Sequence, residues 1–123
     1  MNPESRSADP GTFLPLKPAV FQILVSLAEE ERHGYAIIKE VERRTGGEVV
    51  ILAGALYRFL RRMLEDDLIE ESEERPAPEA DDARRRYYRI TDFGRTVAIA
   101  EADRLERLLR DARVARLHPE TAG

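Results

Sequence analysis

Three arginines on one short segment are the charged side chains whose spacing points most clearly to a chemistry. Arg58, Arg61 and Arg62 stand at i, i+3 and i+4, so a helix carries them on one face. The apolar residues around them are spaced for a second, buried face: Leu56, Phe59, Leu60, Met63 and Leu64. A helix that is apolar on one face and cationic on the other suits the binding of nucleic-acid phosphates.

The alternative for this segment is an ordinary solvated helix face. Such a face usually pairs its cations with acidic residues about four positions away, and here only Glu65 and Asp66 offer that. Arg58 is nearest the start of the helix, so it is the candidate for reading base edges, where arginine pairs bidentately with guanine. Arg61 and Arg62 are candidates for phosphate contacts.

A second basic cluster, Arg84, Arg85 and Arg86, follows an acidic stretch. Between residues 65 and 82, ten acidic residues stand against one basic residue, Arg75. Two interpretations are open: the arginines pair with the acidic stretch, or they lie along the DNA backbone or in the minor groove. The net charge of −4 argues only weakly against nucleic acid, because a local patch binds phosphate and the total charge does not.

Composition excludes several other classes. A chain of 123 residues suggests one domain, and the absence of cysteine excludes disulfides and thiolate metal sites. His33 and His118 have no ligand spacing and no catalytic motif is present, so we expect no metal, no cofactor and no enzyme. No apolar run approaches the roughly 20 residues that cross a membrane, and residues 1–11 do not form a signal peptide. We therefore expect a cytoplasmic protein without membrane contact.

The order of elements indicates the fold. Periodicity predicts helices over residues 16–30, 34–44, 53–66 and 92–117, and strands over 68–72 and 85–91. This order is that of a winged helix-turn-helix, mainly α with a small β-hairpin, plus a long C-terminal dimerisation helix. The expected organisation is a disordered tail (1–12), a winged helix-turn-helix DNA-binding domain (13–91), a dimerisation helix (92–117) and a second tail (118–123).

The last helix carries a seam of small and apolar residues. They alternate at four and three positions, as in a short coiled coil: Ala98, Ala102, Leu105, Leu109 and Ala112. The seam predicts either a dimer contact or a helix that closes the core of a single chain.

Three segments of the chain resemble the PadR-like transcriptional regulators. Residues 32–37 (RHGYAI) match the family's HGYxI, and residues 53–69 (AGALYRFLRRMLEDDLI) are similar to PGTLYxxLxRLExxGLI. Residues 85–95 (RRYYRITDFGR) are similar to RKYYxLTxxGR. These motifs at these separations are specific, and the single helix after the wing looks like the short subfamily.

The resemblance implies a DNA-binding repressor, usually a homodimer, that a small molecule or another signal releases from its operator. The residues expected to contact DNA are Tyr35, Lys39, Tyr57, Arg58, Arg61, Arg62, Arg84, Arg85 and Arg86. For the two tyrosines a buried position is the alternative. Two-fold symmetry predicts a palindromic operator in double-stranded DNA, with half-sites roughly 10 bp apart or a multiple of that.

This chain departs from the family pattern at three places. Ala53-Gly54-Ala55 stands where the family has Pro-Gly-Thr, so a capping hydroxyl is lost. Asp67 replaces a glycine and must either adopt the left-handed conformation or change the turn. The wing turn is also unusually acidic. These departures favour the rival interpretation, a winged-helix protein-interaction module that no longer binds DNA and docks a basic partner.

An effector pocket is harder to place from the sequence. Short relatives bind flat aromatic molecules between the two C-terminal helices, but here the last helix has no aromatic residue after Phe93. A pocket lined by Val20, Phe21, Ala98 and Leu105 is one expectation. Tightly packed helices without a pocket are the other.

Overall fold

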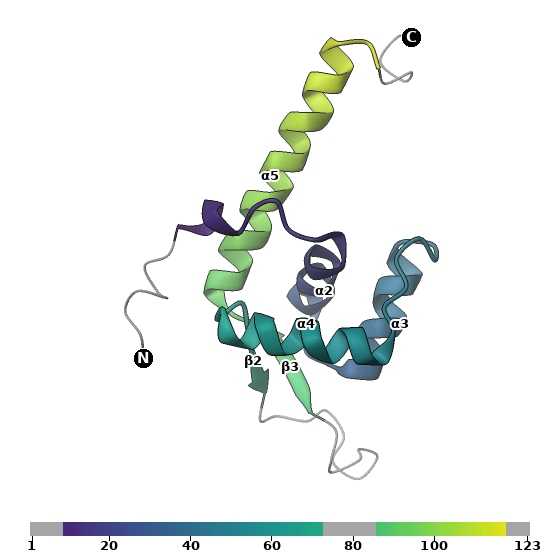
Figure 1. Ribbon diagram of the computed structural model, residues 1–123, viewed down its shortest axis with the longest axis vertical. Helices are drawn as coiled ribbons and strands as arrows, with labels where there is room; N and C mark the ends of the chain where they lie inside the picture. The colour runs from purple at the N-terminus through teal and green to yellow at the C-terminus, as the bar shows by residue number, and fades with distance from the viewer. Residues whose placement is uncertain (1–8, 73–85, 118–123) are drawn as a thin grey trace.

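The computed structural model of the chain describes residues 9–72 and 86–117 and is mainly helical (Figure 1). Its elements are η1 (Pro10–Phe13), α2 (Pro18–Glu29), β1 (Arg32–His33), α3 (Gly34–Arg44), α4 (Ala53–Glu65), β2 (Ile69–Ser72), β3 (Tyr87–Ile90) and α5 (Asp92–Val114). The C-terminal half of α5 extends away from the other elements (Figure 1). The predicted fold class, a mainly α winged helix-turn-helix with a small sheet and a long last helix, is confirmed.

The sheet has three antiparallel strands in the order β1-β3-β2, one strand more than predicted. The hairpin of β2 and β3 was expected, and it pairs Ile69 with Ile90 at its inner end. The additional strand, β1, pairs His33 with Tyr87. The sequence predicted only a break between two helices here, since a strand of two residues leaves no periodic signal.

Both tyrosines of β3 are buried, although strict alternation along a strand exposes every second side chain. The ring of His33 explains this, because it packs edge-on against Tyr87 with 5.3 Å between ring centroids. Nδ1 of the same histidine accepts a hydrogen bond of 3.2 Å from the backbone N–H of Ala36 and so caps α3. His33 therefore has a structural role where β1 joins α3.

The core lies where α2, α3 and α4 meet the sheet and the start of α5. All four helices contribute buried apolar side chains: Ile23, Leu24 and Leu27; Ile37 and Val41; Leu56, Leu60 and Met63; and Val97. Burying one side chain of this size contributes roughly 1.5–3 kcal/mol before conformational entropy is subtracted. The packing places the apolar stripe of α4 inward and leaves its opposite face to solvent.

The ends of two helices adopt the geometry that the local sequence predicts. Gly46 and Gly47 follow α3 with φ angles of 62° and 86°. Asp67 follows α4 and adopts the left-handed conformation itself, with a φ of 61°. Its carbonyl accepts a hydrogen bond of 2.6 Å from the hydroxyl of Thr91. Thr91 also caps α5, because its hydroxyl oxygen accepts a hydrogen bond of 2.9 Å from the N–H of Gly94.

The N-terminal segment is more ordered than expected. Residues 1–12 were predicted to be a disordered tail, but Pro10–Phe13 form the 3-10 helix η1, capped by the side chain of Asp9. The ring of Phe13 packs edge-on against Phe93 of α5, with 5.7 Å between centroids. The prediction was wrong for residues 9–12 because it weighed their polar composition and ignored the anchor that Phe13 provides. Residues 1–8 and 118–123 lie outside the described residues.

Candidate nucleic-acid interface

The structure places the three arginines of α4 on its exposed face, opposite Leu56, Leu60 and Met63. Arg58 and Arg61 form no ion pair with any residue in the described ranges 9–72 and 86–117. Arg62 differs, because its Nε lies 3.1 Å from Oδ2 of Asp66. Its side chain is still 76% exposed, and an ion pair this solvated is weak enough for a phosphate to replace the carboxylate. Two of the three guanidinium groups therefore lack a local partner.

One cation and one aromatic ring of α3, Lys39 and Tyr35, lie near an aromatic ring of α4, Tyr57. Tyr35 and Tyr57 are 61% and 54% exposed, so the alternative of a buried position is wrong for both. The ammonium of Lys39 lies 5.6 Å from the centre of the Tyr35 ring. The hydroxyl of Tyr57 lies so close to the start of α3 that a Cβ on Gly34 would stand 3.0 Å from it. Tyr57 of α4 and the side chains of Tyr35 and Lys39 on α3 are thus all exposed to solvent.

The described part of the wing contains arginines that are paired with acidic residues. Arg86 lies 3.1 Å from Glu71 across the hairpin, and Nε of Arg89 lies 2.8 Å from Glu70. The interpretation that Arg86 pairs with nearby carboxylates is therefore correct in the unbound chain. Both partners of that pair are exposed, so it costs little to exchange. Arg84 and Arg85, the other two residues of the predicted basic cluster, lie outside the described residues.

The first turn of α4 carries no polar side chain. Leu52 stands at the N-cap position, where it makes no capping hydrogen bond, and it is 72% exposed. Val50 is exposed as well, whereas Ile51 between them is buried. Residues 50–52 form neither a helix nor a strand and lead directly into α4. The sequence did not predict that two of these apolar side chains would face solvent beside the arginines.

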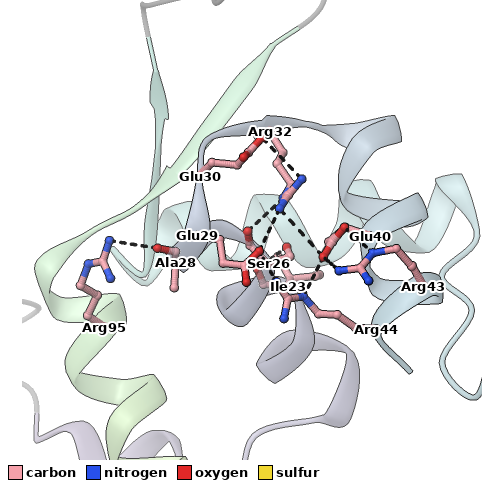
Figure 2. A network of polar contacts seen from close by, with 10 residues as sticks. All are labelled: Ile23, Ser26, Ala28, Glu29, Glu30, Arg32, Glu40, Arg43, Arg44 and Arg95. Carbon is pink, nitrogen blue, oxygen red and sulfur yellow. Dashed lines mark hydrogen bonds and ion pairs between the residues drawn. The ribbon is translucent and has the colours of Figure 1, made fainter. Parts of the chain in front are cut away.

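A network of ion pairs sets the position of α3 relative to α2 (Figure 2). Nε of Arg32 donates a hydrogen bond of 3.0 Å to the carbonyl of Ser26 at the end of α2. Arg44 of α3 pairs with Glu29 of α2 and, at 3.1 Å, with Glu40. The hydrogen bond from Arg43 is the main cause that lowers the pKa of the Glu40 carboxyl, and burial partly opposes it. The sequence did not predict this network, because its residues belong to three different elements, α2, β1 and α3.

The predicted dimerisation seam is incompletely covered in a single chain. Leu105 and Leu109 are 40% and 39% exposed, and Ala102 is also exposed to solvent. Ala98 and Ala112 are half-buried. Leu108, Val114 and Leu117 add further exposed apolar side chains to the same half of α5 or to its end. The single chain therefore covers the seam only in part, and the dimer contact stays a prediction.

One of the four residues of the expected effector pocket, Val20, lines a cavity in the described part of the single chain. Val20 lines a cavity beside α4, whereas Phe21, Ala98 and Leu105 do not line it. Phe21 and Ala98 are half-buried and Leu105 is exposed. A pocket formed between two C-terminal helices needs a second chain, so this expectation stays a prediction.

With the fold and the interface described, the relatives can be compared. Residues 23–100 match the transcriptional regulator PadR-like family, and this range is more than half of the chain. The chain belongs to the PadR-like family. The resemblance in the three motifs is thereby confirmed, and the PadR-like protein is placed among transcriptional regulators.

A relative from another organism aligns with part of the chain. The chain is similar to a protein of Lysinibacillus sphaericus named "Uncharacterized protein X", with 33% identity over 73 residues, which cover 59% of this chain and 64% of that protein. The match thus spans less than two thirds of that relative.

No helix within residues 9–72 and 86–117 of the PadR-like protein is long and apolar enough to cross a membrane.

Solved structures share the fold of the PadR-like protein. A transcriptional regulator from Clostridium thermocellum is 25% identical with a TM-score of 0.65, covering 77% of this chain and 86% of that one. A PadR family regulator from Eggerthella lenta is 25% identical with a TM-score of 0.59, covering 89% and 86%. RosR from H. salinarum is 27% identical with a TM-score of 0.57, covering 84% and 98%.

Proposed function

We propose that this PadR-like protein is a homodimeric, sequence-specific DNA-binding repressor. The observation that carries the proposal is the exposed face of α4, where Arg58 and Arg61 have no ion-pair partner among the described residues while the opposite face is buried. A helix of this kind fits the major groove of double-stranded DNA, which is wide enough to admit it. Helix α4 is the recognition helix of this proposal, and the wing lies along the flanking backbone.

The side chains around α4 take different roles in this complex. Arg58 reads a base edge, because it stands closest to the N-terminal end of the recognition helix. Arg61 and Arg62 bind phosphates, and Arg62 exchanges Asp66 for a phosphate oxygen. Further phosphate contacts come from α3, from a tyrosine of α4 and from the wing. These residues are Tyr35 and Lys39, then Tyr57, and then Arg84, Arg85 and Arg86.

The exposed seam of α5 supports the homodimer. Leu105 and Leu109 belong to the C-terminal half of α5 and are 40% and 39% exposed. This half of the helix extends away from the other elements (Figure 1). Exposed apolar side chains at this spacing are buried at low cost by a second copy of the same helix. Two-fold symmetry of the dimer then requires a palindromic operator with half-sites roughly 10 bp apart or a multiple of that.

Release of the operator by a small molecule or another signal completes the proposal. As a transcriptional regulator the protein acts where the chromosome is, so we assign it to the cytoplasm, without membrane contact. Because the family consists of transcriptional regulators, we assign no catalytic activity to this protein. Base reading and phosphate binding by its arginines need no metal or cofactor.

Selection of bound sequences from a random pool of duplex DNA tests the function directly. We expect a palindromic motif, since both subunits read the same half-site. The selected duplex and a random duplex are then titrated at about 50 and 200 mM salt. A protein that neutralises about six phosphates loses roughly 10³-fold in affinity over this range, because bound counterions are released. Absence of binding to either duplex at low salt would show that the protein-interaction module is the correct alternative.

A further inference from the structure

A cavity of about 590 Å³ lies between the N-terminal segment and the recognition helix. One wall is formed by residues 13–20, including Leu16 and Val20, and the other by α4, including Phe59 and Met63. This volume is in the range of small-molecule sites, which enclose about 300–1,000 Å³. The walls are largely apolar, so the interior suits a hydrocarbon or aromatic body.

The rim of this cavity is mainly cationic. Lys17, Arg58 and Arg62 line it together with a single acidic residue, Asp66. Asp66 already pairs with Arg62, so Lys17 and Arg58 remain without an ion pair among the residues that the structure describes. The ammonium of Lys17 lies 5.9 Å from the centre of the Phe59 ring, which places its charge directly above the apolar wall. An apolar interior beneath two unneutralised cations matches a molecule with one anionic end.

We propose that this cavity binds an amphipathic organic anion, with its apolar body against Phe59 and Met63 and its anionic group between Lys17 and Arg58. The site lies within one chain and includes residues of the recognition helix itself. It is therefore distinct from a pocket between the C-terminal helices of a dimer. The regulatory part of the inference rests on the proposed function, in which Arg58 and Arg62 contact DNA.

The consequence for regulation is direct competition. Arg58 cannot hold the ligand's anionic group and a base edge at the same time, and a bound anion also lowers the positive potential of the rim around Arg62. Ligand and operator therefore exclude each other without any rearrangement of the fold. By thermodynamic linkage, operator DNA weakens the binding of the ligand by the same factor as the ligand weakens operator binding.

Three probes with the same tail test the chemistry of the site in the full chain without DNA: octanoate, octan-1-ol and octylammonium. Binding is measured by calorimetry and by chemical-shift changes at Val20, Phe59 and Met63. We expect octanoate to bind about tenfold more tightly than octan-1-ol, because only the carboxylate pairs with the rim, and octylammonium to bind most weakly. Equal affinities for the three head groups, or shifts elsewhere in the protein, would overturn the proposal.

The chain offers a matched pair of variants, since Lys17 and Lys39 are its only two lysines. Both are exposed, and the ammonium lies 5.9 Å from the centre of an aromatic ring in Lys17 and 5.6 Å in Lys39. Of the two, Lys17 lines the cavity and Lys39 does not. We expect Lys17→Gln to weaken octanoate binding about tenfold and to remove the preference over octan-1-ol, whereas Lys39→Gln leaves both unchanged. Equal effects of the two variants contradict the site. Circular dichroism and thermal unfolding confirm that both remain folded.

Competition is measured separately, by the fluorescence anisotropy of labelled operator DNA. Octanoate should release the operator from the unaltered protein, and Lys17→Gln should need about tenfold more octanoate for the same release. Operator binding that persists when octanoate saturates the protein would overturn direct competition. If the unaltered protein bound no DNA at all, the proposed function would fail, while the measurements without DNA would still decide whether the cavity takes an anion.

Discussion

At the scale of single residues, the three arginines of α4 are not equivalent. Arg58 stands nearest the start of the helix and has no ion-pair partner among the described residues, whereas Arg62 is paired with Asp66. An arginine that reaches a base edge discriminates between sequences, but one that reaches a phosphate strengthens all complexes alike. The position of each guanidinium along α4 therefore predicts which property its removal changes.

Replacement of Arg58 tests the reading of bases. Arg58→Ala should reduce the preference for one operator base by roughly 1–3 kcal/mol, as the affinities for the operator and its single-base variants would show. Arg61→Ala and Arg85→Ala are the controls, which should weaken binding to all sequences by similar factors. If Arg58→Ala lowered the affinities for operator and random DNA equally, Arg58 would be a phosphate contact.

Glu101 is a buried carboxylate that joins α5 to the N-terminal segment. Its side chain is 3% exposed and accepts hydrogen bonds of 2.7 and 2.9 Å from Arg104. The hydrogen bond from Arg104 is the main cause that lowers the pKa of Glu101 below 4.5; burial opposes it, and a backbone bond from Leu16 adds to it. A lowered pKa in the folded state stabilises the protein above the pKa of the unfolded chain, and this contribution is lost as the pH falls through the folded value.

We therefore expect the free energy of unfolding to decrease as the pH drops below about 4.5, measured by urea denaturation. Glu101→Gln should lose roughly 1–3 kcal/mol at neutral pH, because a charged hydrogen-bond acceptor is removed from a buried position. The same variant should lose less stability on acidification. Glu106→Gln, an exposed position on the same helix, is the control and should behave like the unaltered protein. Parallel pH profiles for all three proteins would contradict the role of Glu101.

At the scale of elements, the close contact between the start of α5 and the segment that joins α4 to β2 depends on one glycine, Gly94. A Cβ on Gly94 would stand 2.0 Å from the carbonyl oxygen of Leu68, which is backbone and has little freedom to move. The same carbonyl accepts a hydrogen bond of 3.1 Å from the N–H of Thr91. Gly94 therefore allows α5 to approach the hairpin closely enough to cover the core.

Replacement of Gly94 tests this close approach. Gly94→Ala should destabilise the protein by roughly 1–3 kcal/mol or more, because the added methyl group overlaps the backbone. Gly54→Ala, in the first turn of α4, is the matched control: a Cβ there would meet only the end of the Arg58 side chain at 3.9 Å. Since alanine favours a helix over glycine, the control should be neutral or slightly stabilising. Similar unfolding midpoints for the two variants would show that α5 can shift to accept a side chain.

Other elements show which local patterns predict structure. Helix α3 begins and ends where its periodicity and its two glycines predict, and α4 begins at the predicted Ala53. Both depend on interactions within a few residues of the chain. Strand β1 and helix η1 were missed, because each is too short for a periodic signal and is held by contacts with distant residues, β3 in one case and Phe93 in the other.

At the scale of the whole molecule, α5 has two parts with different surroundings. Its first turns pack into the core through Val97, while Leu105 and Leu109 remain partly exposed. A lone helix with an uncovered apolar seam is costly in water, so a second subunit is the expected cover. In the proposed homodimer, the two copies of α4 lie at a set distance, which would determine the spacing of the operator half-sites.

Sedimentation of a seam variant tests the assembly. Leu105→Asp should convert the dimer to a monomer, because a carboxylate is then buried without a partner in the seam. Arg107→Asp introduces the same residue about 200° further around the helix and should leave the dimer intact. An unchanged dimer in Leu105→Asp would assign the seam to the core of the single chain.

The sequence by itself determined the order of the main elements and the separation of apolar and cationic faces on α4. These features follow from backbone sterics and helical spacing, which act between near neighbours. Only the tertiary structure decided that Glu101 is buried, that both tyrosines of β3 are buried, and that Lys17 and Arg58 line the same cavity. Those relations join residues that are far apart in the chain, and no local pattern encodes the packing that brings them together.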